Sequence, residues 1–500
     1  MSLQFVTGSS GSGKSTYLYQ QIIEESLADP GRFFLVIVPE QFTMSSQRQL
    51  VQMHPLHGLM NIEILSFERL AYRVFDELGI NPASVLEEMG KNLVVRRVAE
   101  ELSTQLPTLG RNMRKRGYVS QVKSFISELS QYHISPEEFE EMIQTPGMSA
   151  SFYQKGADLH RLYQGFMDFI EDKYITSEQL LEKLTDVVEE SLFVRDSVIV
   201  LDGFTGFTPV QNQLLLRLLP LAASVSCAVT IDPSESLFGE VAEEELFAMS
   251  KKMVQSLVKM AEMTGVDVEE PVVLSMDEAS RYPSEGALRH LEANLFRKEK
   301  SVYTDAESIH LTRAENPKEE LTYVAATIRG LLRSGDYHYG DFAVVCAKME
   351  EYSPYIDDIF RSYEIPLFKD EKATILLQPA VEFVRSAIGL VEGRFSYDAV
   401  MHFFRCGLSG LSREEIDGLD NYLYESGLRG KTKWLHPFAV CPRGFDAGDL
   451  VEMNRIREYF IGKTTDFLEA FSKKQDTVRS FATALYELME SFEVEAQCDA

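Results

Sequence analysis

The chain contains 500 residues, which is more than one hydrophobic core usually serves, so about two to four domains are expected. Its 49 basic and 77 acidic residues give a net charge of −28, which counts against a free-standing DNA-binding protein because nucleic acid is repelled at long range. The apolar runs are too short for a membrane span, and no secretory signal precedes the first predicted strand. The five cysteines form no Cys-x-x-Cys pair. We therefore expect a cytoplasmic protein with no metal site within residues 1–500.

The first part of the chain predicts strands that alternate with helices. Apolar runs at residues 3–8, 33–38 and 62–67 predict three short buried strands, and apolar periodicity predicts helices over residues 14–27 and 68–78. Strands that alternate with helices form parallel sheets with right-handed crossovers. The fold class is therefore predicted to be α/β.

Helical periodicity without a convincing strand then occupies residues 83–189. Strand character returns at residues 198–201 and 225–231. We therefore expect one α/β domain made of residues 1–82 and 190–285, interrupted by a helical insertion of a size typical of a small domain.

A second α/β unit is expected over residues 300–392. Apolar runs at residues 308–313 and 342–346 predict two of its strands, and helices are predicted over residues 317–333 and 352–363. Residues 393–500 are predicted to be helical again. Because nothing resembling a terminal segment precedes Ala500, we expect further sequence beyond it.

The most specific motif lies between the first strand and the first helix. Its spacing, G-x-x-x-x-G-K-S, predicts a loop whose backbone N–H groups surround phosphate oxygens, with a lysine that reaches the β- and γ-phosphates and a serine hydroxyl that binds Mg²⁺. The alternative is a Ser/Gly-rich turn with a chance lysine. The motif favours a site for ATP with Mg²⁺ formed by Gly8, Ser9, Ser10, Gly11, Ser12, Gly13, Lys14 and Ser15.

An acidic residue at the end of a second strand would complete such a site. Asp202 follows the apolar run 198–201 and is the candidate for the Mg²⁺ shell, although an Asp-Gly pair is also common turn chemistry. The next residue is Gly203, where an active motor would carry a glutamate. We therefore expect nucleotide binding with weak hydrolysis or none.

Several segments together resemble superfamily 1 helicases of the UvrD/RecB type, and most closely the AddB family of bacterial AddAB helicase–nucleases. The ATP-binding half of the pattern is kept, whereas Gly203, Glu235 and Ala347 replace groups that activate water or contact phosphate in the family. The matching segments are Gln41-Phe-Thr, Ser66-Phe-Glu-Arg-Leu-Ala, Asp202-Gly-Phe, Ile231-Asp-Pro-Ser-Glu-Ser-Leu-Phe-Gly and Ala343-Val-Val-Cys-Ala.

The resemblance implies more than the residues themselves show. It implies RecA-like domains, an inactivated motor core that scans single-stranded DNA for Chi, and a heterodimer with an AddA-like motor subunit that processes double-strand ends for recombinational repair. It also implies a C-terminal 5′→3′ exodeoxyribonuclease domain. That domain's Mg²⁺ and four-iron cluster are expected beyond residue 500.

Two loops at the carboxyl edge of the predicted sheet carry residues suited to single-stranded DNA. Aromatic rings stack on bases, arginine supplies charge, and glutamine or threonine can bond base edges. For the aromatic residues the alternative is packing of the following helix. The candidates are Gln41, Thr43, Phe67, Arg69 and Tyr72 from these two loops, and Phe207, which follows the segment that begins at Asp202.

The densest basic cluster lies in the helical insertion and comprises Arg111, Arg114, Lys115 and Arg116. The cluster either grips phosphates or is a solvated loop between helices.

Two other functions fit the phosphate loop. One is a self-sufficient P-loop ATPase or small-molecule kinase without a DNA role, and the other is a scaffold that binds ATP for stability alone. The large helical insertion and the second α/β unit favour the motor architecture.

Overall fold

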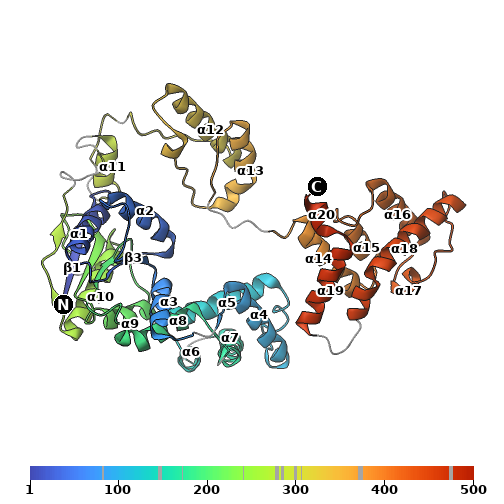
Figure 1. The fold of residues 1–500 in the computed structure, drawn as a ribbon, viewed down its shortest axis with the longest axis horizontal. Helices are drawn as coiled ribbons and strands as arrows, with labels where there is room; N and C mark the ends of the chain where they lie inside the picture. The colour runs from blue at the N-terminus through green and yellow to red at the C-terminus, as the bar shows by residue number, and fades with distance from the viewer. Residues whose placement is uncertain are drawn as a thin grey trace. The chain divides into compact units, whose positions relative to one another are not determined.

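The computed structural model describes the chain apart from residues 82–83, 145–148, 172, 240, 276–280, 283–285, 298–300, 306, 370–374, 472–476 and 500. The expected domain boundaries at residues 82–83, 285, 300 and 500 lie outside the described residues. The chain divides into two compact units, Met1–Leu311 and Thr312–Ala500, whose elements are labelled in Figure 1.

The first unit is built on a seven-stranded sheet in which every recorded strand pair is parallel. The strand order is β3-β2-β6-β7-β1-β8, and β9 also pairs with β1. This sheet confirms the predicted α/β class and the parallel pairing. Its strands are β1 Ser2–Gly8, β2 Phe34–Ile37, β3 Ile62–Leu65, β6 Val198–Leu201, β7 Ser224–Thr230, β8 Asp267–Val268 and β9 Val272–Val273.

Helices cover both faces of this sheet because its central strands are apolar on both sides. In β2, Phe34 and Val36 pack with α1 and α2, whereas Leu35 and Ile37 pack into the core on the opposite face. The helices of these two layers are α1 Lys14–Ala28, α2 Thr43–Met53, α3 Phe67–Leu78, α8 Ser177–Val187, α9 Pro209–Leu218 and α10 Ala248–Thr264.

A helical region with its own core interrupts the sheet-forming sequence. Two short strands, β4 Ser84–Val85 and β5 Tyr174–Ile175, pair with each other where the chain enters and leaves this region. The prediction of no strand over residues 83–189 is therefore wrong at these positions, because two-residue strands are too short to produce a periodic signal. The helices of this region are α4 Glu88–Glu101, α5 Arg116–Gln131, α6 Pro136–Ile143 and α7 Ala150–Ile170.

The second unit is helical in all of its described residues that have regular structure. The helices predicted over residues 317–333 and 352–363 are confirmed to within three residues at each end. Its helices are α12 Pro317–Ser334, α13 Met349–Ser362, α14 Pro379–Glu392, α15 Tyr397–Phe404, α16 Arg413–Ser426, α17 Lys431–Trp434, α18 Ala447–Ala470, α19 Val478–Ser491 and α20 Val494–Asp499.

The strands predicted at residues 308–313 and 342–346 are wrong, since neither segment forms a strand. Leu311 and Val345 are almost fully exposed instead of buried. A strand needs neighbours to satisfy its backbone and cover its side chains, and Thr312–Ala500 contains no strand among its described residues. Apolar composition alone therefore does not produce a strand here.

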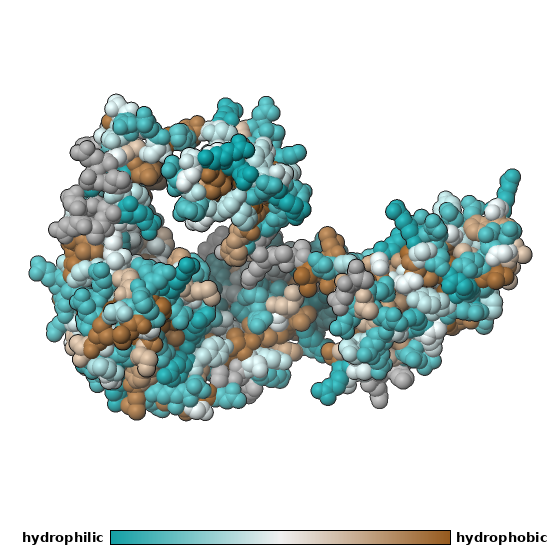
Figure 2. Space-filling view, turned by 45° about the horizontal axis from the view of Figure 1, so that its top comes forward, coloured by the Kyte–Doolittle hydropathy of each residue, from teal (hydrophilic) through white to brown (hydrophobic). Residues whose placement is uncertain are grey.

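The surface agrees with the composition, in which 25% of the residues are charged. Most residues visible in Figure 2 are hydrophilic, and the hydrophobic ones occur in small groups. Within the part of the chain that the structure describes, no helix has the length and apolar character that a membrane crossing requires.

Candidate nucleotide site and the loops beside it

The glycine-rich loop joins β1, an inner strand of the sheet, to the first residue of α1. Gly13 is the N-cap of α1 in a left-handed conformation, and Lys14 and Ser15 open the helix. The first backbone N–H groups of a helix have no partner within it and favour negative charge. This loop therefore presents free N–H groups and a helix dipole at the carboxyl edge of a parallel sheet.

The Lys14 side chain folds back across the loop. Its Nζ donates hydrogen bonds to the carbonyl oxygens of Gly8, at 2.9 Å, and Ser9, at 2.8 Å. Burial lowers the pKa of Lys14, and the charges of Asp202 and Glu292 oppose that effect. The ammonium group is thus held at the loop, where it can neutralise an anion.

Asp202 lies where β6 ends and joins the two parts of the site. Its Oδ1 accepts a hydrogen bond from Ser15 Oγ at 3.1 Å, and its Oδ2 accepts one from the buried Tyr19 hydroxyl at 2.9 Å. Burial and the neighbouring Asp202 raise the pKa of Tyr19, so this hydroxyl stays protonated as a donor. A carboxylate and a serine hydroxyl in contact form a donor set of the kind that binds Mg²⁺.

Sequence reasoning did not identify Tyr19, although it follows Ser15 by four residues. That spacing places two side chains on the same face of a helix. The spacing is the signal that could have paired Tyr19 with the motif.

Arg281 is a second residue that sequence reasoning missed. Its backbone N–H donates to the Gly11 carbonyl oxygen at 2.9 Å, and its side chain borders a pocket of about 480 Å³ together with Lys14, Ser15 and Gln49. A Cβ atom at Gly11 would lie 3.1 Å from the Tyr282 ring, so glycine permits this close approach. No sequence signal connects positions that are 270 residues apart.

The Ser12 hydroxyl is the buried polar atom of the loop that remains unsatisfied. Ser12 is fully buried, and its Oγ has no hydrogen-bond partner among the described residues. Buried hydroxyls without partners are uncommon in folded proteins. An orphaned hydroxyl inside a loop of converging polar groups fits a site completed by a ligand or by water.

The residue after Asp202 has a backbone that disfavours a side chain. Gly203 has φ of 79°, in the left-handed region. A Cβ atom there would lie 3.4 Å from the Phe42 ring and 3.5 Å from Pro39, both in the loop that follows β2. The position where the resemblance expects a water-activating glutamate therefore lacks both the carboxylate and a backbone suited to one.

Glu235, which the resemblance aligns with a γ-phosphate-sensing glutamine, is engaged in ion pairs. Its carboxylate contacts Lys251 Nζ at 2.9 Å and Arg297 Nη1 at 3.0 Å. Arg297 also pairs with Asp232. These contacts join Glu235 to α10 and to Arg297.

The candidate DNA residues divide into exposed and inward-facing groups. Gln41, Arg69 and Tyr72 are exposed. Arg69 Nη2 pairs with Glu40 Oε1 at 2.9 Å, so its guanidinium is held over the short helix Glu40–Phe42.

The other three candidates face inward to different extents. Phe67 is buried, with its ring centroid 5.6 Å from that of Phe204 and 6.2 Å from that of Phe207, which is half-buried. Thr43 is buried, and its Oγ1 donates to the Glu40 carbonyl oxygen at 3.0 Å. The exposed ring in this segment belongs to Phe42.

Comparison with known proteins gives consistent matches. Residues 5–292 match the family model described as "ADDB, N-terminal". Similar proteins include three that are each named as a subunit of an ATP-dependent helicase/deoxyribonuclease. The protein of Lachnoclostridium phytofermentans is 40% identical over 99% of this chain and 43% of its own length. That of Pelotomaculum thermopropionicum is 31% identical over 100% of this chain and 44% of its own length.

The third relative, from Caldanaerobacter subterraneus, is 32% identical over 87% of this chain and 37% of its own length. The chain therefore spans less than half the length of the curated relatives that it matches.

Proposed function

The chain belongs to the AddB N-terminal family, and from this premise we propose that it is the nucleotide-binding, helicase-like part of a protein that processes DNA ends. Its relatives are named as one subunit of an ATP-dependent helicase/deoxyribonuclease. The observation that carries the proposal is the convergence of Lys14, Ser15 and Asp202 at one edge of a parallel sheet.

We propose that ATP binds with its phosphates in the loop from Gly8 to Ser15. The lysine ammonium and the N-terminus of α1 neutralise the phosphates, and Ser15 with Asp202 holds Mg²⁺. Arg281 borders the same pocket and adds a second cation. Bound Mg²⁺ would supply charge neutralisation between phosphate oxygens.

Hydrolysis by this chain is proposed to be slow or absent. No carboxylate follows Asp202, and the left-handed Gly203 backbone strains any residue with a Cβ atom. Glu235 is paired with two cations instead of being available to a phosphate. The protein then senses or holds nucleotide while a partner motor moves the DNA.

For DNA, we propose that the exposed Gln41, Arg69 and Tyr72 contact a single strand directly. Thr43, Phe67 and Phe207 support these loops from inside, since the first two are buried and the third is half-buried. Phe42 is 44% exposed, and its ring is proposed to stack on a base.

The remaining features of the proposal concern the whole protein. They are a cytoplasmic heterodimer with an AddA-like motor and nuclease partner, action on single- and double-stranded DNA, and scanning for Chi. They also include RecA-like architecture, with nuclease Mg²⁺ and an iron–sulfur cluster beyond residue 500.

The test is to measure binding of a fluorescent ATP analogue and ATP turnover, with and without single-stranded DNA. We expect Mg²⁺-dependent binding with negligible turnover in both conditions. Strong DNA-stimulated turnover by this chain alone contradicts the inactivated-motor proposal. Phosphoryl transfer to a metabolite would instead support the small-molecule kinase.

A further inference from the structure

The helical region of the first unit contains a pocket of about 780 Å³ that plays no part in the nucleotide site. It lies between α4 and the loop that leads to α5. Arg96, Arg111 and Arg114 line it, against one acidic residue, Glu100. Arginine forms paired hydrogen bonds to phosphate with a planar, permanently charged group.

Apolar side chains anchor the loop that carries Arg111 and Arg114 to the core of the helical region. Leu106, Leu109 and Met113 are buried in the core of the helical region, whereas Arg111, between Leu109 and Met113, and Arg114, after Met113, are exposed.

A buried carboxylate fixes the same loop. Asp158 in α7 is fully buried, and its Oδ2 accepts hydrogen bonds from the backbone N–H groups of Thr108, at 2.8 Å, and Leu109, at 2.9 Å. Its Oδ1 accepts one from Arg161 at 3.1 Å. Burying a charge is costly unless it is fully bonded, so this contact holds the loop in one shape.

The positive charges of this loop have no acidic partner in the part of the chain that the structure describes. Among the described residues, Arg111, Arg114, Lys115 and Arg116 form no ion pair, although acidic residues outnumber basic ones in the chain. By contrast, Arg97 in α4 pairs with Glu101 at 2.7 Å. The cations are left available to an anion from outside.

The start of α5 increases the local positive potential. Lys115 is the N-cap of α5, and Arg116 is the first residue of the helix. The first turn contains no acidic residue and no side-chain cap bond. Cations at the positive end of a helix are electrostatically unfavourable, and a bound anion would relieve the repulsion.

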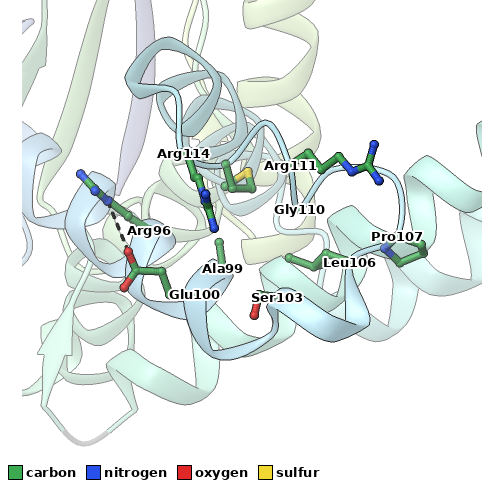
Figure 3. Close-up of a pocket in the computed structure, with 10 residues that line it drawn as sticks. Arg96, Ala99, Glu100, Ser103, Leu106, Pro107, Gly110, Arg111 and Arg114 are labelled. Atoms are coloured by element: carbon green, nitrogen blue, oxygen red, sulfur yellow. Dashed lines mark ion pairs between the residues drawn. The ribbon is translucent and has the colours of Figure 1, made fainter.

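We propose that this pocket grips the phosphodiester backbone of a DNA strand. The choice of DNA rests on the proposed function, while the phosphate chemistry rests on the arginines themselves. In Figure 3, the Arg114 side chain ends above Ala99, beside the Arg96–Glu100 ion pair, whereas the Arg111 side chain extends away from them to the right. Charge spread in this way suits consecutive phosphates of a polymer better than one small anion.

The experiment compares two charge-matched double variants of the 500-residue chain. Arg111→Gln/Arg114→Gln removes two cations of the pocket, and the control Arg97→Gln/Arg217→Gln removes two exposed cations that lie outside it. Binding of labelled duplex and single-stranded DNA is measured by fluorescence anisotropy over a range of salt concentrations.

We expect the pocket variant to bind DNA about tenfold more weakly. The slope of log affinity against log salt should fall by about 1.8 for duplex or about 1.4 for single strands, which is the loss of two phosphate contacts. The control variant should show the same slope as the unsubstituted chain. Equal slopes in the two variants would overturn the inference.

Two further outcomes separate this inference from the proposed function. If Arg69→Ala weakens DNA binding while the pocket variant does not, the inference fails and the proposed function stands. If the pocket variant binds DNA normally but no longer binds a purified partner protein, the pocket is a protein-docking surface and the inference also fails. Binding of the fluorescent ATP analogue should be unchanged in the pocket variant.

Discussion

The loops that follow β1 and β6 lie at the same edge of one sheet, yet they differ in what they retain. The β1 loop has a lysine ammonium, a serine hydroxyl and a helix N-terminus, and its Lys14 and Ser15 border a pocket of about 480 Å³. The β6 loop retains Asp202, but its next residue is a left-handed glycine. The group that would orient water is missing, whereas the groups that hold charge remain.

If the proposed function is right, holding a nucleotide and splitting it depend on separable parts of the fold. Phosphate binding uses backbone N–H groups and side chains that also organise the start of α1, so it is tied to the architecture. Water activation depends on single side chains, which can be lost without disturbing the sheet. Four predictions test this separation.

The largest effect is expected from Lys14→Ala. Removing a cation that contacts phosphate should weaken ATP-analogue binding by about 100-fold, since charge-assisted bonds are worth up to about 3 kcal/mol. Fluorescence titration in the presence of Mg²⁺ measures the loss. Lys252→Ala removes a lysine paired with Glu243 and should bind normally. Equal affinities in the two variants would show that the loop does not hold the nucleotide.

The second prediction concerns pH. Burial lowers the pKa of Lys14 from its ordinary 10.5, and the protonated form binds phosphate. Affinity for the ATP analogue should therefore be highest where Lys14 is protonated and decline as the pH rises through the lowered pKa, at a lower pH than an ordinary lysine would cause. Lys14→Arg retains its charge over the same pH titration and serves as the control. An identical decline in the arginine variant would assign the effect to another group.

The third prediction restores the missing carboxylate with Gly203→Glu. The left-handed backbone should make this variant less stable by about 1–2 kcal/mol, and ATP turnover should stay negligible. Urea unfolding and a phosphate-release assay measure these two quantities. Gly203→Asn is the matched control, because asparagine tolerates the left-handed region. Turnover appearing in the glutamate variant would show that one side chain alone inactivated the motor.

The smallest effect is expected from Tyr19→Phe, which removes the hydroxyl that bonds Asp202 Oδ2. Losing one neutral donor to a carboxylate should weaken Mg²⁺-dependent nucleotide binding only a few-fold, through a less well-fixed carboxylate. Titrating Mg²⁺ at fixed ATP analogue detects the change. A shift equally large in a Mg²⁺-free titration would argue that Tyr19 acts through packing.

Local sequence patterns predicted much of the first unit. The strands at residues 3–8, 33–38 and 198–201 and the helix at 14–27 agree with β1, β2, β6 and α1 to within one residue at each end. Short apolar runs and capping residues act locally, so they can be read from neighbouring positions. The same reasoning failed at residues 342–346, whose apolar character is similar to that of β2 but which lie in a unit without a strand among its described residues.

By itself, the sequence determined the glycine-rich loop between the first strand and the first helix, the alternation of strands and helices around it, and the absence of a glutamate after Asp202. Only the tertiary structure decided that Tyr19 bonds Asp202 and that Arg281 borders the Lys14 pocket. It also decided that Phe67 is buried while Phe42 is exposed. In the helical region, it decided that Asp158 anchors the loop bearing Arg111. The physical reason is the distance along the sequence over which each interaction acts. Backbone conformation and periodicity depend on neighbours a few residues away, whereas these contacts join segments that meet only when the chain packs.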